Sequence, residues 1–384
     1  MNRWLGLPLF LLMMFVMFQG VFTLGAPLQD WLAGAIETGE AWLRHAALIR
    51  ALPPVVQSFL LDGLLAGVGV VLSFLPIIVL FFFFLSLIED SGYMARAAFL
   101  MDRLMHLLRL DGKAFISLLL GYGCNVPAVM GSRILSSRHN RILAMLLIPF
   151  TLCSARLQVF LFLSAILFAP RTAGLVVFGL YLLSFVIIIL VGLLLRPFRF
   201  GDPEPFIMEL PPYRLPLLRT VLLRAWQEIR GFVKRAATLI VLGVIAIWFL
   251  THVPADVPPG SEATLAGRIG LWLAPVFSPL GIGWAETVAL FFGFIAKEIF
   301  IGALAVVYGT ASLGTAISNS VTPLQGLSLM VFTLIYTPCI ATLASIRMES
   351  RSWRVTLLSV ALGLILAWLA SFAVYQGGVL LGYR

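Results

Sequence analysis

Three cysteines are the residues whose type and position most directly suggest a chemistry. Cys124, Cys153 and Cys339 all fall inside apolar segments, close to residues that disturb helical hydrogen bonding. Those neighbours are Gly123 and Pro127 for the first cysteine, Pro149 for the second and Pro338 for the third. Proline removes a hydrogen bond and frees a carbonyl, so a thiol and a carbonyl can face the same space. Soft or borderline divalent cations bind thiolates well, and we therefore predict that these thiols contact a metal ion.

A competing interpretation is that each cysteine is only a small buried apolar residue, which is the commoner role of a lone free cysteine. Because all three cysteines lie beside helix-breaking residues, we favour the ligand role. Asn125, next to Cys124, adds an amide oxygen to the predicted ligands. It could equally cap the broken helix, and both roles stay open.

Charged residues within apolar runs are the second chemical signal. Arg156 and the adjacent pair Lys297 and Glu298 lie deep within such runs, where an ionisable group costs about 2.5 to 3.5 kcal/mol on insertion scales. We expect them to face the protein interior, with Glu298 contacting the ion and Lys297 or Arg156 as counter-ion. A purely structural salt bridge is the alternative.

Further candidates for an ion path surround the end of one apolar run. Glu89 and Asp90 could form an acidic inner mouth for a cation, although simple solvation at a helix end is the plainer interpretation. Met94 and Asp102 follow shortly after and are assigned to the same path, although methionine usually only fills gaps. The sequence has neither an HExxH nor a CxxC motif, which argues against a zinc enzyme.

The elements that must position these residues are transmembrane helices. Of the 384 residues, 61% are hydrophobic and only 11% are charged, so lipid must be the main solvent. Uninterrupted apolar runs approach the roughly 20 residues needed to span a bilayer; examples are 68–87, 175–195 and 357–373. The fold class is therefore an all-α polytopic membrane protein. The net charge of +9 comes from basic residues in short connections, which sets topology and does not indicate nucleic-acid binding.

Charge and helix breakers divide the chain into four parts. Residues 1–56 hold a first transmembrane helix with its N-terminus in the cytoplasm, followed over 25–54 by an amphipathic helix on the outer surface. Residues 57–195 and 236–384 form two halves of opposite orientation, joined by a basic cytoplasmic linker over 196–235. We expect about seven crossings, with broken or re-entrant segments at 114–135 and 287–308. Inverted repeats with interrupted helices are typical of transporters.

Five motifs, in order along the chain, closely resemble the membrane domain of FeoB-type ferrous iron transporters. They are residues 88–103 (IEDSGYMARAAFLMDR), 121–128 (GYGCNVPA), 153–156 (CSAR), 296–298 (AKE) and 338–342 (PCIAT). The resemblance implies a permease of two gate-type repeats in the inner membrane of a bacterium or archaeon. It implies import of Fe(II) as substrate, past the motif cysteines, with no permanently bound cofactor.

FeoB proteins normally begin with a cytoplasmic G domain, which this sequence lacks. Neither GxxxxGK[ST] nor an Asn-Lys-x-Asp motif occurs, so we expect a transporter without GTPase activity of its own. A separate FeoB-like G protein could dock on the linker, transport could be uncoupled from GTP, or the chain could be a fragment. Besides lipid, a small FeoA-like protein and a homo-oligomer are candidate partners. Two rival functions are gate-type transport of another solute such as a nucleoside, and a non-transporting membrane scaffold.

Overall fold

The computed structural model describes most of the chain as helices. The described residues are 3–45, 52–93, 96, 99, 102, 105–106, 108, 110–135, 137–197, 216–233, 238–254, 257–258, 260–297, 299–308 and 313–382. Within these ranges no strand occurs, and the predicted all-α class is confirmed. The chain forms two compact units, one of residues 1–116 and 205–248 and the other of residues 117–204 and 249–384.

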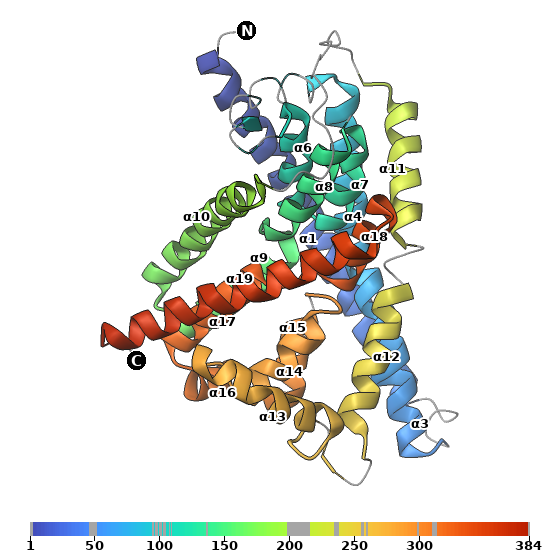
Figure 1. Cartoon of the computed structure of the whole chain (residues 1–384). Coiled ribbons are helices and arrows are strands. Elements are labelled where there is room, and N and C mark those ends of the chain that lie inside the picture. Colours follow the sequence, from blue (N-terminus) through green and yellow to red (C-terminus); the bar gives the residue numbers. More distant parts are fainter. Residues whose placement is uncertain are drawn as a thin grey trace. The chain divides into compact units, whose positions relative to one another are not determined.

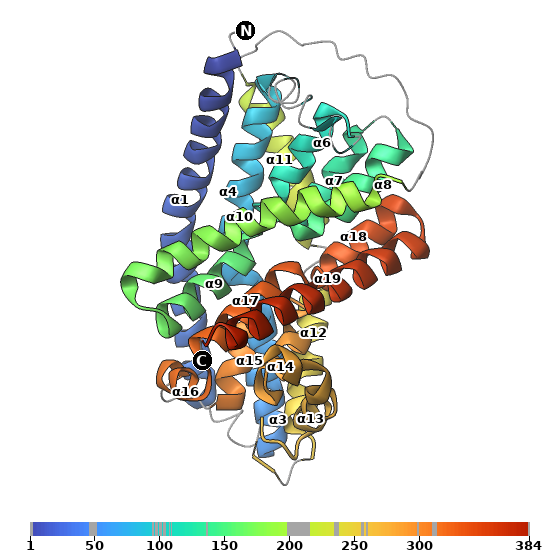
Figure 2. The ribbon, with the colours of Figure 1, turned by 60° about the vertical axis from the view of Figure 1, so that its left-hand side comes forward.

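The first unit is built on one long apolar helix, α4, and the helices that cover it. Its main elements are α1 (Arg3–His45), α3 (Pro54–Ser58), the π-helical turn Phe59–Leu65, α4 (Ala66–Asp90) and α11 (Leu218–Phe232). Helix α1 packs lengthwise against α4 (Figure 2). The sequence predicts a separate surface helix over 25–54, but the structure continues α1 without a break as far as His45.

Helix α11 lies within the predicted linker and packs against α4. Phe82 of α4 is buried with Ala225 and Ile229 of α11 in one apolar cluster. The acidic end of α4 is held at the same contact, because Glu89 pairs with Arg224 at 3.3 Å and Asp90 accepts the Leu217 N–H at 3.0 Å. The linker therefore includes an amphipathic helix that covers the apolar face of α4.

The second unit holds the broken helices. Its first part contains the end of α6 (Gly112–Gly121), α7 (Asn125–Gly131), α8 (Arg138–Leu147), α9 (Ser154–Leu167) and α10 (Pro170–Leu195). The end of α12 (Thr238–His252) leads into its second part, which contains α13 (Leu265–Phe277), α14 (Trp284–Gly293), α15 (Ile299–Tyr308), α16 (Leu313–Ser320), α17 (Pro323–Ile335), α18 (Ile340–Ser350) and α19 (Trp353–Leu380). Helices α17 and α19 pack side by side (Figure 1).

Five helical segments in the described ranges are long and apolar enough to cross a membrane. They are Val55–Asp90, Arg138–Leu167, Arg171–Leu195, Pro323–Ser350 and Trp353–Leu380, and two further pairs of bent helices raise the number to seven if each pair is one span. These five coincide with five of the predicted crossings. The crossing predicted over 237–250 corresponds to the shorter apolar helix Val241–His252.

The outer faces of these helices fit a lipid environment. On α10, large apolar side chains at helical spacing are exposed: Leu175, Phe178, Leu182 and Phe185. Such a continuous apolar stripe would be unfavourable in water, whereas hydrocarbon solvates it without cost. The chain is therefore a multi-pass membrane protein, as its composition predicts.

Both segments that the sequence predicts to be broken are interrupted in the structure. The first stops at Gly121 and resumes as α7 at Asn125, while the second stops at Gly293 and resumes as α15 at Ile299. Each half contains another break, where the chain is extended before α9 and before α18. The inverted orientation of the two halves stays a prediction.

Candidate transport site

Each cysteine occupies the residue immediately before a helix that follows a break. Cys124 precedes α7, Cys153 precedes α9 and Cys339 precedes α18, so all three are N-cap residues with non-helical backbone. None of these three cysteines is in a disulfide, and each residue is partly exposed. Backbone N–H groups in the first turn of a helix lack partners within the helix and carry partial positive charge. Each thiol therefore lies at the start of its own helix, in a local environment that favours a negative charge.

Backbone hydrogen bonds join the two breaks within each half of the second unit. The N–H of Ser154, next to Cys153, donates to the carbonyl of Gly123 at 3.2 Å, and the Ser154 hydroxyl donates to the same carbonyl at 3.0 Å. In the other half, the N–H of Ile340, next to Cys339, donates to the Phe294 carbonyl at 3.1 Å. The start of α9 thus lies against the break before α7, and the start of α18 lies against the break after α14.

Arg156 forms hydrogen bonds with both of the unwound segments that precede α9 and α18. Its side chain is 0% exposed. One guanidinium nitrogen, Nη1, donates to the carbonyls of Pro149 and Thr151 at 2.6 and 3.0 Å, and Nη2 donates to the Tyr336 carbonyl at 2.9 Å. These carbonyls are available because the backbone around them is not helical. Within the described ranges Arg156 makes no ion pair, so carbonyl dipoles compensate its charge there.

Lys297 likewise binds a backbone carbonyl in the unwound segment before α18. Its side chain is 3% exposed, and its Nζ donates to the Thr337 carbonyl at 2.9 Å. The same nitrogen lies 3.1 Å from the centre of the Tyr336 ring, a close cation–π contact. Thr337 stands two residues before Cys339, as Thr151 stands two residues before Cys153. A buried cation therefore binds the corresponding carbonyl in each half.

Asn125 is buried beside these breaks and not open to solvent. It is 5% exposed, and its Oδ1 lies 2.9 Å from the Thr151 hydroxyl. That hydroxyl also lies 2.8 Å from the Ile148 carbonyl, and its single proton can serve only one acceptor at a time. Asn125 is the first residue of α7 and not its cap. An amide oxygen has two lone pairs, so one stays available for a ligand.

Tyr336 lies near both later cysteines. The thiols of Cys339 and Cys153 both lie close enough to the Tyr336 hydroxyl to interact with it electrostatically. The Cys339 Sγ also lies 3.2 Å from the Thr342 hydroxyl. In the part of the chain that the structure describes, no group of three or more His, Cys, Asp or Glu side chains could hold a metal ion. A transiting ion would thus need backbone or hydroxyl oxygens beside sulfur.

The other residues predicted to lie on the ion path are not in the segments that precede α7, α9 and α18. Glu89 and Asp90 end α4 in the first unit, where both contact α11. Asp102 accepts the N–H of Gly112, the first residue of α6, at 2.9 Å and lies 3.1 Å from His106. Met94 and Glu298 lie outside the described residues.

Gly121 permits the close approach of the two breaks in the first half. A Cβ atom at this position would lie 2.3 Å from Thr151 Oγ1 and 3.0 Å from Thr151 Cγ2. We expect Gly121→Ala to displace Thr151 and its bond to Asn125, and to destabilise the protein by about 1–3 kcal/mol. Thermal unfolding of the purified protein measures this. Gly174→Ala is a matched control, because nothing lies within 4 Å of a Cβ added there. Equal melting temperatures for both variants would contradict the packing described.

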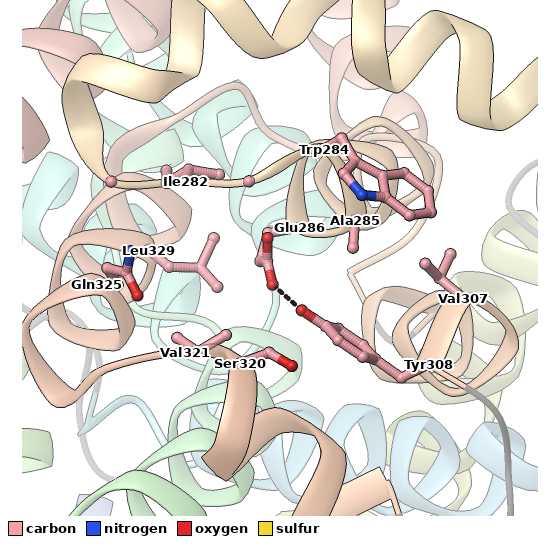
Figure 3. A pocket seen from close by; sticks show the side chains of 12 residues that line it. Ile282, Trp284, Ala285, Glu286, Val307, Tyr308, Ser320, Val321, Gln325 and Leu329 are labelled. Atoms are coloured by element: carbon pink, nitrogen blue, oxygen red, sulfur yellow. Dashed lines mark hydrogen bonds between the residues drawn. The ribbon is translucent and has the colours of Figure 1, made fainter. Parts of the chain in front are cut away.

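One buried acidic residue is missed by the sequence pattern. The sequence indicates an outer connection over 251–286, and in the structure Glu286, the last residue of that stretch, is 5% exposed in the first turn of α14. It lines a cavity with Tyr308, which donates a hydrogen bond to Glu286 Oε1 (Figure 3). An acidic residue in a first turn is a helix-start signal, and Gly283 is a permitted N-cap residue, so this pattern could have placed Glu286 inside α14.

Family models match most of the region that contains these breaks. The gate model described as "Nucleoside recognition" covers residues 71–167 and 233–353, and the model "Ferrous iron transport protein B C terminus" covers residues 177–227. The chain belongs to the gate family, and it also matches the C-terminal model of ferrous iron transport protein B. The gate model includes Cys124, Cys153 and Cys339, and the FeoB C-terminal model ends within α11.

Curated FeoB proteins are similar along nearly the whole chain. The Fe(2+) transporter FeoB of Synechocystis sp. is 44% identical over 98% of this chain and 62% of its own length. A Porphyromonas gingivalis protein named as a fusion of Fe(2+) transport protein A and Fe(2+) transporter FeoB is 37% identical, over 99% of this chain and 51% of its own. The Fe(2+) transporter FeoB of Methanocaldococcus jannaschii is 40% identical, over 85% of this chain and 50% of its own length. The chain thus spans about half to three fifths of these relatives. No solved structure matches.

Proposed function

We propose that the chain forms the membrane permease of a ferrous iron importer and passes Fe(II) along Cys124, Cys153 and Cys339, with Asn125 as an oxygen ligand. The observation that carries this proposal is the shared position of the three thiols, each at the start of a helix that follows a break. The names of the FeoB relatives supply the substrate class. Fe(II) would be the cargo, and the proposed path needs no resident cofactor.

The chemistry at the breaks suits an ion that must exchange water for protein ligands. Thiolates bind borderline metals such as Fe(II), and unwound backbone within a membrane protein presents carbonyl oxygens where it lines a cavity. Both ligand types occur together around α7, α9 and α18. A partial rather than complete set of ligands is suitable for transport, because an ion that binds too tightly cannot leave.

Arg156 and Lys297 fit this proposal as positioning residues and as fixed positive charges. Their carbonyl contacts hold the backbone at Thr151, Tyr336 and Thr337 in place. As buried positive charges, both side chains would also be stabilised by negative charge nearby. Metal-bound thiolates would supply it. Without thiolates, the positive charges of Arg156 and Lys297 would repel a metal ion that is bound only to neutral ligands.

The wider mechanism is proposed to be inward transport by alternating access between two inverted halves, with the N-terminus in the cytoplasm of a bacterium or archaeon. Glu89 and Asp90 would attract the ion at the inner mouth, and Asp102, Met94 and Glu298 would relay it. A separate G protein is proposed to dock on the linker around α11. The fusion of transport protein A to a FeoB relative supports a small FeoA-like partner.

Uptake of ⁵⁵Fe(II) into proteoliposomes tests this function. We expect accumulation above the level of protein-free vesicles, competition by excess unlabelled Fe(II), and no uptake of tritiated uridine. The uridine arm is needed because the matching gate model is described by nucleoside recognition. Uridine uptake without iron uptake would establish the rival solute, and uptake of neither, with and without GTP and partner proteins, would support the scaffold.

A further inference from the structure

A second polar site lies within the second unit, in the cavity that contains Glu286. The cavity has a volume of about 290 Å³ and is bounded by the start of α14 and the ends of α15 and α16, together with the first turns of α17. The polar side chains that line it are those of Trp284, Glu286, Tyr308, Ser320 and Gln325. Figure 3 shows the Glu286 carboxylate directed into this space and toward the Tyr308 hydroxyl.

The Glu286 carboxylate is buried without a cationic partner. Only 5% of the residue is exposed, and Tyr308 donates its hydroxyl proton to Oε1. No lysine, arginine or histidine in the described part of the chain forms an ion pair with it. Glu286 lies in the first turn of α14, but a helix N-terminus supplies only about half an elementary charge. An ionised carboxylate in this setting therefore needs a further positive charge.

The donor atoms around the cavity select the kind of cation. Carboxylate, hydroxyl and amide oxygens are hard ligands, and none of the lining residues is a cysteine, methionine or histidine. Alkali and alkaline-earth cations prefer such oxygen sets. A single carboxylate balances one positive charge, whereas a divalent ion would leave an excess charge in a medium of low dielectric constant. The volume also leaves space for a few waters, each occupying about 30 Å³.

We infer that the Glu286 cavity binds one monovalent alkali cation, with the chemistry of Na⁺, held by the Glu286 carboxylate, the Tyr308 and Ser320 hydroxyls and water. The site is distinct from the cysteine path, and its existence does not depend on iron transport. Gly283 contributes by its lack of a side chain, because a Cβ there would lie 2.7 Å from Glu286 Oε2. The cation replaces the basic side chain that such a buried carboxylate would otherwise need.

Equilibrium binding of ²²Na⁺ to the purified full chain tests the inference, with choline replacing unlabelled sodium at constant ionic strength. We expect saturable binding of about one ion per chain. Glu286→Gln should weaken binding at least tenfold, because the amide keeps the shape and loses the charge. Tyr308→Phe should weaken it several-fold. Glu262→Gln removes an exposed carboxylate in the same unit and should leave it unchanged.

Two results would overturn the inference. One is retention of full ²²Na⁺ binding by Glu286→Gln. The other is a wild-type protein that binds no sodium but whose melting temperature varies with pH in a manner that Glu286→Gln removes, since the carboxyl group would then carry a proton. Should Glu286→Gln fail to fold, Gly283→Ala takes its place: it keeps the carboxylate, crowds Oε2 and is expected to weaken binding, and unchanged affinity would contradict the site.

Discussion

Replacing Arg156 by methionine is expected to abolish transport and to lower the thermal stability of the protein strongly. The substitution leaves the carbonyls of Pro149, Thr151 and Tyr336 without the donors that now satisfy them. A hydrogen bond to a charged group contributes about 1.5–3 kcal/mol, and unsatisfied buried carbonyls cost a comparable amount. We therefore expect a loss of at least about 3 kcal/mol, measured as a lower melting temperature in detergent.

Two companion variants make this result specific to the carbonyl contacts. Arg156→Lys keeps the charge but offers one ammonium group in place of the planar guanidinium, so an intermediate loss is expected. Arg354→Met removes an exposed arginine from the same unit and should leave the melting temperature unchanged. If Arg156→Met melted at the wild-type temperature, the role of Arg156 in joining the two breaks would be refuted.

Cys124→Ser is expected to reduce Fe(II) uptake at least tenfold while leaving the amount of protein in the membrane unchanged. Uptake should fall without loss of protein because Cys124 is an N-cap residue. Serine is among the preferred N-cap residues, so the substitution should not harm the helix. Its hydroxyl is a poor substitute for a thiolate toward a borderline metal. ⁵⁵Fe uptake by cells that lack other iron importers, normalised to protein detected in membranes, measures the effect.

The same reasoning extends to the other two thiols. Cys153 and Cys339 are also N-cap residues, so their serine variants should fold and should also lose uptake. An alanine variant at each position removes both the sulfur and the hydroxyl, and it should transport no better than the serine variant. Full uptake by Cys124→Ser would remove that residue from the proposed path.

The sequence is sufficient to predict the helices and their breaks, because both depend on neighbouring residues. Apolar runs of about twenty residues specify membrane helices, and the glycines and proline near Cys124 mark an interruption that the structure contains. The sequence also predicts that Arg156 and Lys297 face the interior, since a charge in lipid is costly. Both residues are buried.

The partners of these residues could not be read from the sequence, since they depend on tertiary contacts. The Tyr336 carbonyl that Arg156 binds is 180 residues away in the chain, and a carbonyl has no signature in a sequence. The sequence indicates an outer segment over 251–286 because that stretch holds several prolines and few basic residues, whereas the burial of Glu286 depends on packing by α15, α16 and α17. The continuation of α1 to His45 was similarly hidden by a change from apolar to mixed composition.

The decisive experiment for the proposed iron path is to measure whether Fe(II) protects the three cysteines from alkylation. The purified chain, kept anaerobic, is treated with a small maleimide with and without Fe(II), and the modification of Cys124, Cys153 and Cys339 is quantified by peptide mass spectrometry. We predict that Fe(II) slows the modification of all three thiols and that Mg²⁺ at the same concentration does not. Modification rates that are the same with Fe(II), with Mg²⁺ and without added metal would contradict it.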